Sequence, residues 1–272
     1  MVRLKSYITR YANMKAKNSR KRIIILACLV IILGVASFGL LGLIISFGGP
    51  EPLRPVTYPN EPGFQSAIIW FELAASKEEV FQILGDPKDP QGAHIRQVLD
   101  KTNTYDYCYM IVYSLMCLFI LAVIFYLNQN KPGSSAAKTW ILYSGVFLCI
   151  AMLAGDAMEN VQMLKLTKYA SVPDVDDAVV TALNIWTRVK WGAIFIFAAI
   201  MAWAYSAYFK GKKIPQVLFV MAYGSSAILG LISLSLLNVR FLVEPASYLI
   251  ALAWLLSIIH AGIILKENIM VR

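Results

Sequence analysis

The feature that most constrains the fold is a set of six apolar runs, each long enough to cross a membrane. A bilayer core about 30 Å thick requires roughly 20 apolar residues per helix. Only 15% of the residues are charged, against about 25% in soluble domains, which excludes a water-soluble globule. The pattern predicts an all-α fold, a polytopic transmembrane helical bundle with six spans. The spans extend over Ile23–Phe47, Tyr107–Leu127, Thr139–Leu164, Ile185–Phe209, Gln216–Leu237 and Ala246–Leu265.

The distribution of charge assigns the two sides of the membrane. Segments on the side of the N-terminus carry fifteen basic residues and one acid, whereas the opposite side carries ten basic and fifteen acidic residues. By the positive-inside rule, both termini are therefore cytoplasmic. The net charge of +9 reflects this topology. We expect no nucleic-acid partner, because no aromatic-basic recognition module accompanies the charge.

The pattern divides the chain into five segments. Residues 1–22 form a basic amphipathic segment suited to the anionic lipids of the inner leaflet, or else a plain positive-inside tail. The first span, at 23–47, is longer than the apolar core of a signal peptide, about 7 to 15 residues, and is expected to be an uncleaved anchor. The other segments are a small extracytoplasmic helical cap, a five-helix transmembrane bundle and a cytoplasmic tail, at 48–106, 107–265 and 266–272.

Short helices are predicted within the cap segment. Residues 64–75 are amphipathic and aromatic. Ser76 and Glu79 form a capping box at the start of the next helix, and Gly85 ends it. A further short helix is expected near His94–Asp100, after two Asp-Pro breaks. The cap is either a lid or platform for a partner, or only a shield for the top of the bundle.

Ionisable side chains within the apolar runs are candidate functional residues, because charges are costly in a membrane. Asp156, Glu159 and Asn160 share about 100° of one helix face. The next span starts outside and carries Arg188 and Lys190 at similar depth. We predict that Asp156 pairs with Lys190 and that Glu159 pairs with Arg188. The alternative is that one of the two basic residues faces the loop or another helix, because they lie about 200° apart around the helix. Three more side chains are expected to complete an outward-facing polar ring: Asp106, Arg240 and Glu244.

Three interpretations of this ring are open. Paired charges fix the order and register of the helices in the first. In the second, a small ligand or lipid headgroup enters from outside and exchanges with one of the pairs. In the third, Asp156 and Glu159 bind a divalent ion or act as acid and base. Two carboxyls without a nearby histidine are a weak metal signal, so we expect neither a metal nor a cofactor.

Missing residues exclude several enzyme classes. The chain has only two histidines, His94 and His260, which excludes bis-histidine haem, histidine-rich di-iron and HExxH zinc sites. It also lacks the G-x-x-x-x-G-K-[ST] loop of one large class of nucleotide hydrolases. His260 stands alone on an apolar run and is expected to be a core histidine with its hydrogen bonds satisfied.

Three short motifs carry a resemblance to a known group. They are Phe71-Glu72-Leu73-Ala74, Tyr105-Asp106-Tyr107 and Asp156-Ala157-Met158-Glu159-Asn160. Over roughly residues 65 to 205, the chain resembles a broad group of bacterial multi-span membrane proteins. Its members join an outer E-L-A helical segment to an Asp at the next span and a later D-x-x-E-N motif. The resemblance implies the same topology in an inner or cytoplasmic membrane and draws attention to Asp106, Asp156, Glu159 and Asn160. It assigns no catalytic role to them.

The sequence thus favours an integral membrane protein with an outward-facing charged site and no enzymatic activity. Such a site binds or passes a small or lipidic ligand, or belongs to a scaffold subunit of a membrane complex. The alternative is a membrane enzyme that acts on a lipid or polyprenyl headgroup at the outer leaflet. The expected partners are membrane lipids, membrane proteins or a second copy of the chain.

Overall fold

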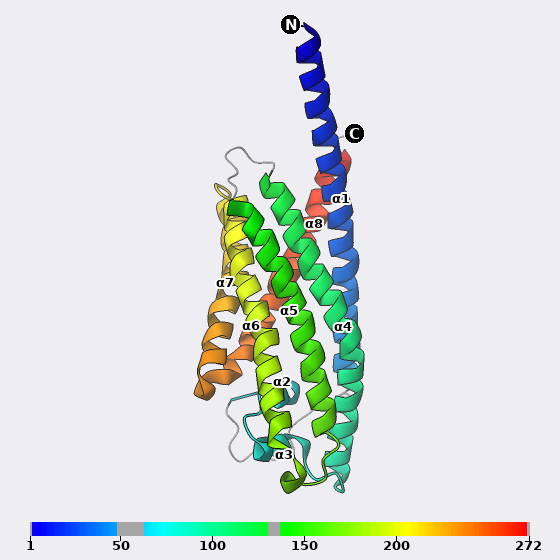
Figure 1. The fold of residues 1–272 in the computed structure, drawn as a ribbon, viewed down its shortest axis with the longest axis vertical. Coiled ribbons are helices and arrows are strands. Elements are labelled where there is room, and N and C mark those ends of the chain that lie inside the picture. Colours follow the sequence, from blue (N-terminus) through cyan, green and yellow to red (C-terminus); the bar gives the residue numbers. More distant parts are fainter. Residues whose placement is uncertain (1, 48–62, 130–136, 271–272) are drawn as a thin grey trace.

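Long helices run side by side in the computed structural model, with two short helices at one end (Figure 1). The structure describes residues 2–47, 63–129 and 137–270. The regular elements in these ranges are all helical: α1 (Val2–Ser46), α2 (Ala67–Glu72), α3 (Lys77–Leu84), α4 (Pro90–Gln129), α5 (Ala137–Leu166), η1 (Val172–Asp174), α6 (Asp177–Tyr208), α7 (Lys213–Ser235), η2 (Leu237–Leu242) and α8 (Val243–Met270).

Six of the described helices, α1 and α4 to α8, contain stretches that are long and apolar enough to cross a membrane. This confirms the predicted all-α, multi-pass architecture. Both ends of the chain lie at one end of the bundle, which we call the termini end (Figure 1). Helices α2 and α3, which we call the cap, lie at the opposite end, the cap end. The side chains that would make the tail amphipathic, from Leu4 to Met14, lie outside the described residues.

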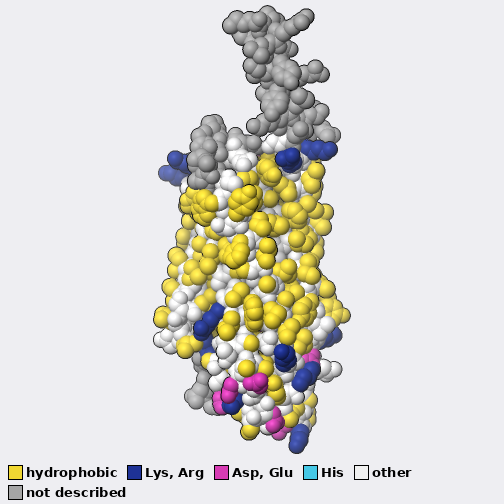
Figure 2. All heavy atoms as spheres, viewed as in Figure 1, with side chains coloured by type: hydrophobic (Ala, Val, Ile, Leu, Met, Phe, Trp, Pro, Cys, Tyr) yellow, Lys and Arg dark blue, Asp and Glu magenta, His cyan; other side chains and the backbone are white. Residues whose placement is uncertain are grey.

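The middle of the bundle presents an apolar surface. Figure 2 shows hydrophobic side chains over most of its length, with the charged side chains gathered toward the two ends. Ile32, Phe147 and Met221, from three different helices, are each at least 60% exposed. A soluble protein rarely exposes so continuous an apolar surface. The described exterior is therefore suited to contact with lipid chains.

Helix α4 differs from the prediction. The short helix expected near His94–Asp100 is not separate, because α4 continues without a break from Pro90 to Gln129. No glycine or proline occurs between Asp100 and Tyr107 to end it. Its 40 residues give a length of about 60 Å, twice the thickness of the bilayer core. The helix thus continues from the apolar belt into the cap end.

The local signals predicted for the cap are confirmed at α3. The Ser76 hydroxyl accepts a hydrogen bond from the backbone N–H of Glu79 at 3.2 Å. The Glu79 carboxylate accepts one from the backbone N–H of Ala75 at 2.8 Å, one residue before the position expected in a capping box. Gly85 ends the helix with φ at +67°, a conformation that favours glycine.

Candidate functional site

A buried lysine on α6 is the centre of the site. Lys190 is only 5% exposed. Its Nζ lies 3.1 Å from Glu72 Oε2 and 3.4 Å from Asp156 Oδ1. The same ammonium contacts Glu159 Oε2. These carboxylates come from α2 in the cap and from α5, so one lysine joins three helices.

A close approach of α5 and α6 places the carboxylates. A Cβ atom at Gly155 would lie 2.6 Å from the backbone nitrogen of Lys190, which is closer than such atoms pack. Asp156 follows directly, and Glu159 lies three residues further on the same helix face. The missing side chain at position 155 therefore lets both carboxyls reach the lysine.

Neutral donors hold the carboxylates in place. The Tyr113 hydroxyl on α4 donates to Asp156 Oδ2 at 2.8 Å. The indole Nε1 of Trp191 donates to Glu72 Oε2 at 2.8 Å, and the Thr187 hydroxyl donates to Glu159 Oε1 at 2.5 Å. Hydrogen bonds to ionised carboxylates are stronger than neutral ones. Each carboxylate that contacts the lysine thus has a second, uncharged partner.

Asp106 on α4 supplies a fourth carboxylate. Its Oδ2 accepts a hydrogen bond from Asn160 Nδ2 at 2.7 Å, and the residue is half-buried. Asp106 interacts electrostatically with Asp156 and Lys190, although it makes no ion pair with the lysine in the described residues. The structure thus brings together five of the predicted site residues: Asp106, Asp156, Glu159, Asn160 and Lys190.

Negative groups outnumber positive ones here. We call Glu72, Asp106, Asp156, Glu159 and Lys190 the acidic cluster. One ammonium cannot neutralise four carboxylates, and uncompensated buried charge is costly. Asp156 Oδ1 accepts no hydrogen bond within the described residues although Asp156 is 97% buried. The arrangement therefore favours the entry of a further positive charge.

The cluster is not arranged as a metal site. Among the described residues, no group of three or more His, Cys, Asp or Glu side chains is placed to hold a metal ion. The ammonium of Lys190 lies where Glu72, Asp156 and Glu159 converge. A monovalent or organic cation, or a proton, fits such a set of partners better than a divalent ion does.

The predicted pair between Glu159 and Arg188 is not formed. Arg188 is exposed, and Glu159 contacts Lys190 and Thr187 instead. Residues two apart on a helix point about 200° away from each other. Only one of the two basic residues can face α5, and the structure places Lys190 there.

Arg240 and Glu244 hold the cap and do not extend the acidic cluster. Arg240 Nη1 donates to the backbone oxygen of Leu73 at 2.7 Å, and its Nη2 contacts the carboxylate of Glu79. Glu244 accepts a hydrogen bond from the backbone N–H of Ser66 at 2.6 Å. The expected ring is therefore two separate groups, one inside the bundle and one at the junction of cap and bundle.

Sequence reasoning missed four members of the site, Glu72, Tyr113, Thr187 and Trp191. Glu72 gave a usable signal, because it is the single charged residue in the aromatic segment 64–75. Tyr113 and Thr187 look like ordinary members of apolar runs. Only the packing of α4 and α6 against α5 shows that their hydroxyls face carboxylates.

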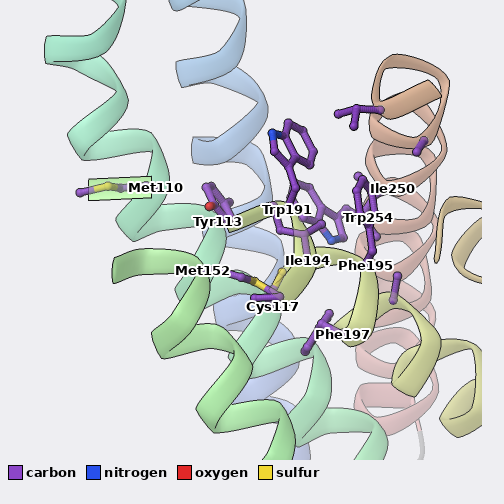
Figure 3. Packing of buried hydrophobic residues seen from close by; sticks show 14 of the residues in the cluster. Met110, Tyr113, Cys117, Met152, Trp191, Ile194, Phe195, Phe197, Ile250 and Trp254 are labelled. Carbon is purple, nitrogen blue, oxygen red and sulfur yellow. The ribbon is translucent and has the colours of Figure 1, made fainter. Parts of the chain in front are cut away.

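The layer next to the acidic cluster, toward the termini end, is hydrophobic. Met152 lies one turn from Asp156, and Cys117 lies one turn from Tyr113. Both side chains are completely buried, and Figure 3 shows them next to each other. The acidic cluster thus borders on an apolar layer. A continuous polar path through the bundle would need polar side chains in this layer, and Met152 and Cys117 do not supply them.

Comparisons of the chain with protein-family models, with curated proteins and with solved structures give no match.

Proposed function

We propose that this membrane protein binds a small cationic ligand, without catalysis, at the acidic cluster. The observation that carries the proposal is the excess of four carboxylates over one ammonium around Lys190, with Asp156 Oδ1 buried and lacking a hydrogen bond. A small primary amine offers the same charge and the same donors as the lysine side chain. It therefore offers Asp156 Oδ1 the hydrogen bond that the ion pair with Lys190 does not supply, and it adds a positive charge to the excess of carboxylates.

Entry from the cap end follows from the position of Glu72. This carboxylate belongs to the cap and is bound to Lys190 and Trp191. A cation that binds beside Glu72 would change this contact between the cap and the bundle. The apolar layer beyond Met152 and Cys117 supports binding at this depth rather than passage through the bundle.

The test is a ligand titration of the full-length protein in nanodiscs. Methylammonium chloride is added in place of sodium chloride at constant ionic strength, and the unfolding temperature is followed. We expect methylammonium to raise it in the wild type, and to raise it less in Asp106→Asn. The matched control is Asp177→Asn, which removes an exposed carboxylate that pairs with Lys77 at 3.4 Å. Equal responses of all three proteins would disprove binding at the acidic cluster.

We infer the orientation from the charges of the described ends. The termini end carries Arg20, Lys21 and Arg22 on α1, together with the lysines around the turn between α6 and α7. By the positive-inside rule this end is cytoplasmic, and the cap is extracytoplasmic. With the bacterial resemblance, the membrane is an inner or cytoplasmic one. In a Cys108→Ser background, which removes an exposed native thiol, Lys88→Cys in the cap end should react with an impermeant maleimide in intact cells, whereas Lys213→Cys should not.

A scaffold role is the second candidate, favoured by the firm attachment of the cap. Arg96 is buried, and its guanidinium donates to the backbone oxygens of Gly85, Thr167 and Tyr169 at 2.8 to 2.9 Å. A fixed cap suits a platform for a partner better than a moving lid. Chemical cross-linking in native membranes tests this, and a partner protein linked to the exposed Lys88 is the expected result.

The enzyme alternative has less support from the geometry. Acid–base chemistry on a headgroup needs an open position between two carboxyls. At the acidic cluster, the ammonium of Lys190 occupies that position between Asp156 and Glu159.

A further inference from the structure

Asp106 is the carboxylate of the acidic cluster that lacks a positive partner. The other three carboxylates each form an ion pair with the Lys190 ammonium, whereas Asp106 forms none within the described residues. Its Oδ2 accepts a hydrogen bond from the neutral amide of Asn160 at 2.7 Å. Asn160 lies one turn along α5 from Asp156. A negative charge on Asp106 would therefore stand about one turn from that of Asp156.

The charged groups that face Asp106 come from three other helices. They interact electrostatically with it and comprise Asp156 on α5, Lys190 on α6 and Glu72 on α2. Helix α1, which packs along α4, carries no titratable side chain in residues 37–47. The nearby titratable groups of α4 itself are phenols, which are uncharged at neutral pH: Tyr107, Tyr109 and Tyr113. One ammonium thus serves all the carboxyls around Asp106.

Two buried amides lie next to Asp106. Asn103 is three residues before it on the same face of α4. The side chain of Asn103 is 2% exposed, and its Nδ2 donates no hydrogen bond within the described residues. Asn160 is equally buried. Because an amide can donate to an ionised carboxylate and accept from a protonated one, this pair suits a carboxyl that changes its protonation state.

We propose that Asp106 carries a proton when the acidic cluster holds no ligand, and that a bound cation displaces this proton. The inference rests on the proposed function, to which it adds a competition between two positive charges. Of two carboxyls that share a site, one retains its proton, because two negative charges at short distance repel each other. A proton adds no volume, so the packed interior accepts it without a cavity. When a primary ammonium binds, Asp106 releases its proton to the solution, and the cluster exchanges one positive charge for another.

Infrared spectroscopy of the full-length protein in nanodiscs tests the proton directly. A protonated carboxyl has a C=O stretching band that is separate from the carboxylate bands and moves when H2O is replaced by D2O. We expect this band in the wild type at neutral pH and a weaker band in Asp106→Asn. The exposed control Asp177→Asn should leave it unchanged. Asp106→Glu keeps an acid at this position and should retain the band.

Methylammonium tests the displacement. It should weaken the band in the wild type and release about one proton per bound cation, which an indicator dye measures in weak buffer. Its apparent dissociation constant should fall about tenfold for each unit of rising pH, over the range in which Asp106 is protonated. This pH dependence should be absent in Asp106→Asn and present in Asp106→Glu.

The outcomes separate this inference from the proposed function. A band as strong in Asp106→Asn as in the wild type would overturn the inference. A methylammonium-induced rise in the unfolding temperature that leaves the band unchanged would also overturn it, while the proposed function would stand. If methylammonium changes neither quantity, the proposed function fails and the displacement fails with it. Circular dichroism shows which variants fold. If Asp106→Asn does not, an affinity independent of pH in the wild type and in Asp106→Glu would overturn the inference.

Discussion

Buried polar groups occur in both halves of the bundle, but they are charged in the half next to the cap and neutral in the half next to the termini. In the cap half, the acidic cluster joins charged groups from α2, α4, α5 and α6. In the termini half, Ser257 on α8 lies 3.1 Å from the Tyr205 hydroxyl and 2.9 Å from that of Tyr223. His260 is buried there against the rings of Tyr205 and Phe209, with centroids 5.7 and 5.2 Å away. His260 is thus a core histidine, as expected, but its Nδ1 forms no hydrogen bond within the described residues, so it is not the satisfied histidine that the sequence predicts.

The difference separates a structural polar group from a candidate binding site. The three hydroxyls of Tyr205, Tyr223 and Ser257 are neutral, and they form hydrogen bonds with one another across α6, α7 and α8. The acidic cluster is charged and retains more carboxylates than its own ammonium can match. Loss of a neutral hydrogen bond costs about 0.5–1.5 kcal/mol, whereas an unpaired buried charge costs about 3–5 kcal/mol. Substitutions in the two halves should therefore differ in size and in their effect on cation binding.

Lys190→Met should have the largest effect. It leaves Glu72, Asp156 and Glu159 without their shared ammonium, so we expect a loss of about 3–5 kcal/mol in the free energy of unfolding. Adding Asp156→Leu should restore part of it, because one of the unpaired charges is then removed. Denaturant unfolding of the four proteins of a double-mutant cycle measures the coupling. Additive effects would show that Asp156 and Lys190 do not interact.

Gly155→Ala should follow, at about 2–3 kcal/mol. Its Cβ would meet the backbone of Lys190 at 2.6 Å, and overpacking of this kind forces the helices apart. Gly39→Ala is the control, since nothing lies within 4 Å of a Cβ at that position. A thermal unfolding series compares the two. An unchanged unfolding temperature in Gly155→Ala would mean that close contact of α5 and α6 is not required.

Ser257→Ala should cost about 1–2 kcal/mol, because the hydroxyls of Tyr205 and Tyr223 lose their common partner. The response to methylammonium should remain that of the wild type. Tyr113→Phe is the counterpart in the other half, where it removes the bond to Asp156 Oδ2. We expect that variant to change the response. Identical titration curves for the two variants would contradict the distinction between the halves.

Glu78→Gln should have the smallest effect, confined to the cap. The first turn of α3 lowers the pKa of Glu78 below its ordinary value of 4.5, mainly through a backbone hydrogen bond and also through Ser76. Ionised Glu78 therefore stabilises the fold at neutral pH, and this contribution is lost as the pH falls through the lowered pKa. The wild type should unfold at a slightly higher temperature than the variant at pH 7, and the difference should vanish in acid.

The architecture was accessible from the sequence because its causes are local. Runs of about 20 apolar residues identify the spans, and the bond from Glu79 to Ser76 needs only neighbours in the chain. The pair of Asp156 with Lys190 was also predictable, because the depth of a residue follows from its position along a span.

The remaining parts of the site depend on tertiary contacts. Glu72 reaches Lys190 only because the cap folds over the bundle, and bonds from Arg240 and Glu244 hold it there. No periodicity in residues 64–75 specifies that placement. The choice between Arg188 and Lys190 likewise depends on the rotation of α6 about its axis, which packing against α5 determines.

The unbroken course of α4 has a mechanical consequence. Arg96, which binds the loops of the cap end, and Tyr113, which binds Asp156, belong to one unbroken helix and stand about 25 Å apart along it. A force applied to the outer end cannot be absorbed by a hinge between them. If a bound protein or ligand tilted the outer end of α4, Tyr113 would therefore move sideways relative to Asp156.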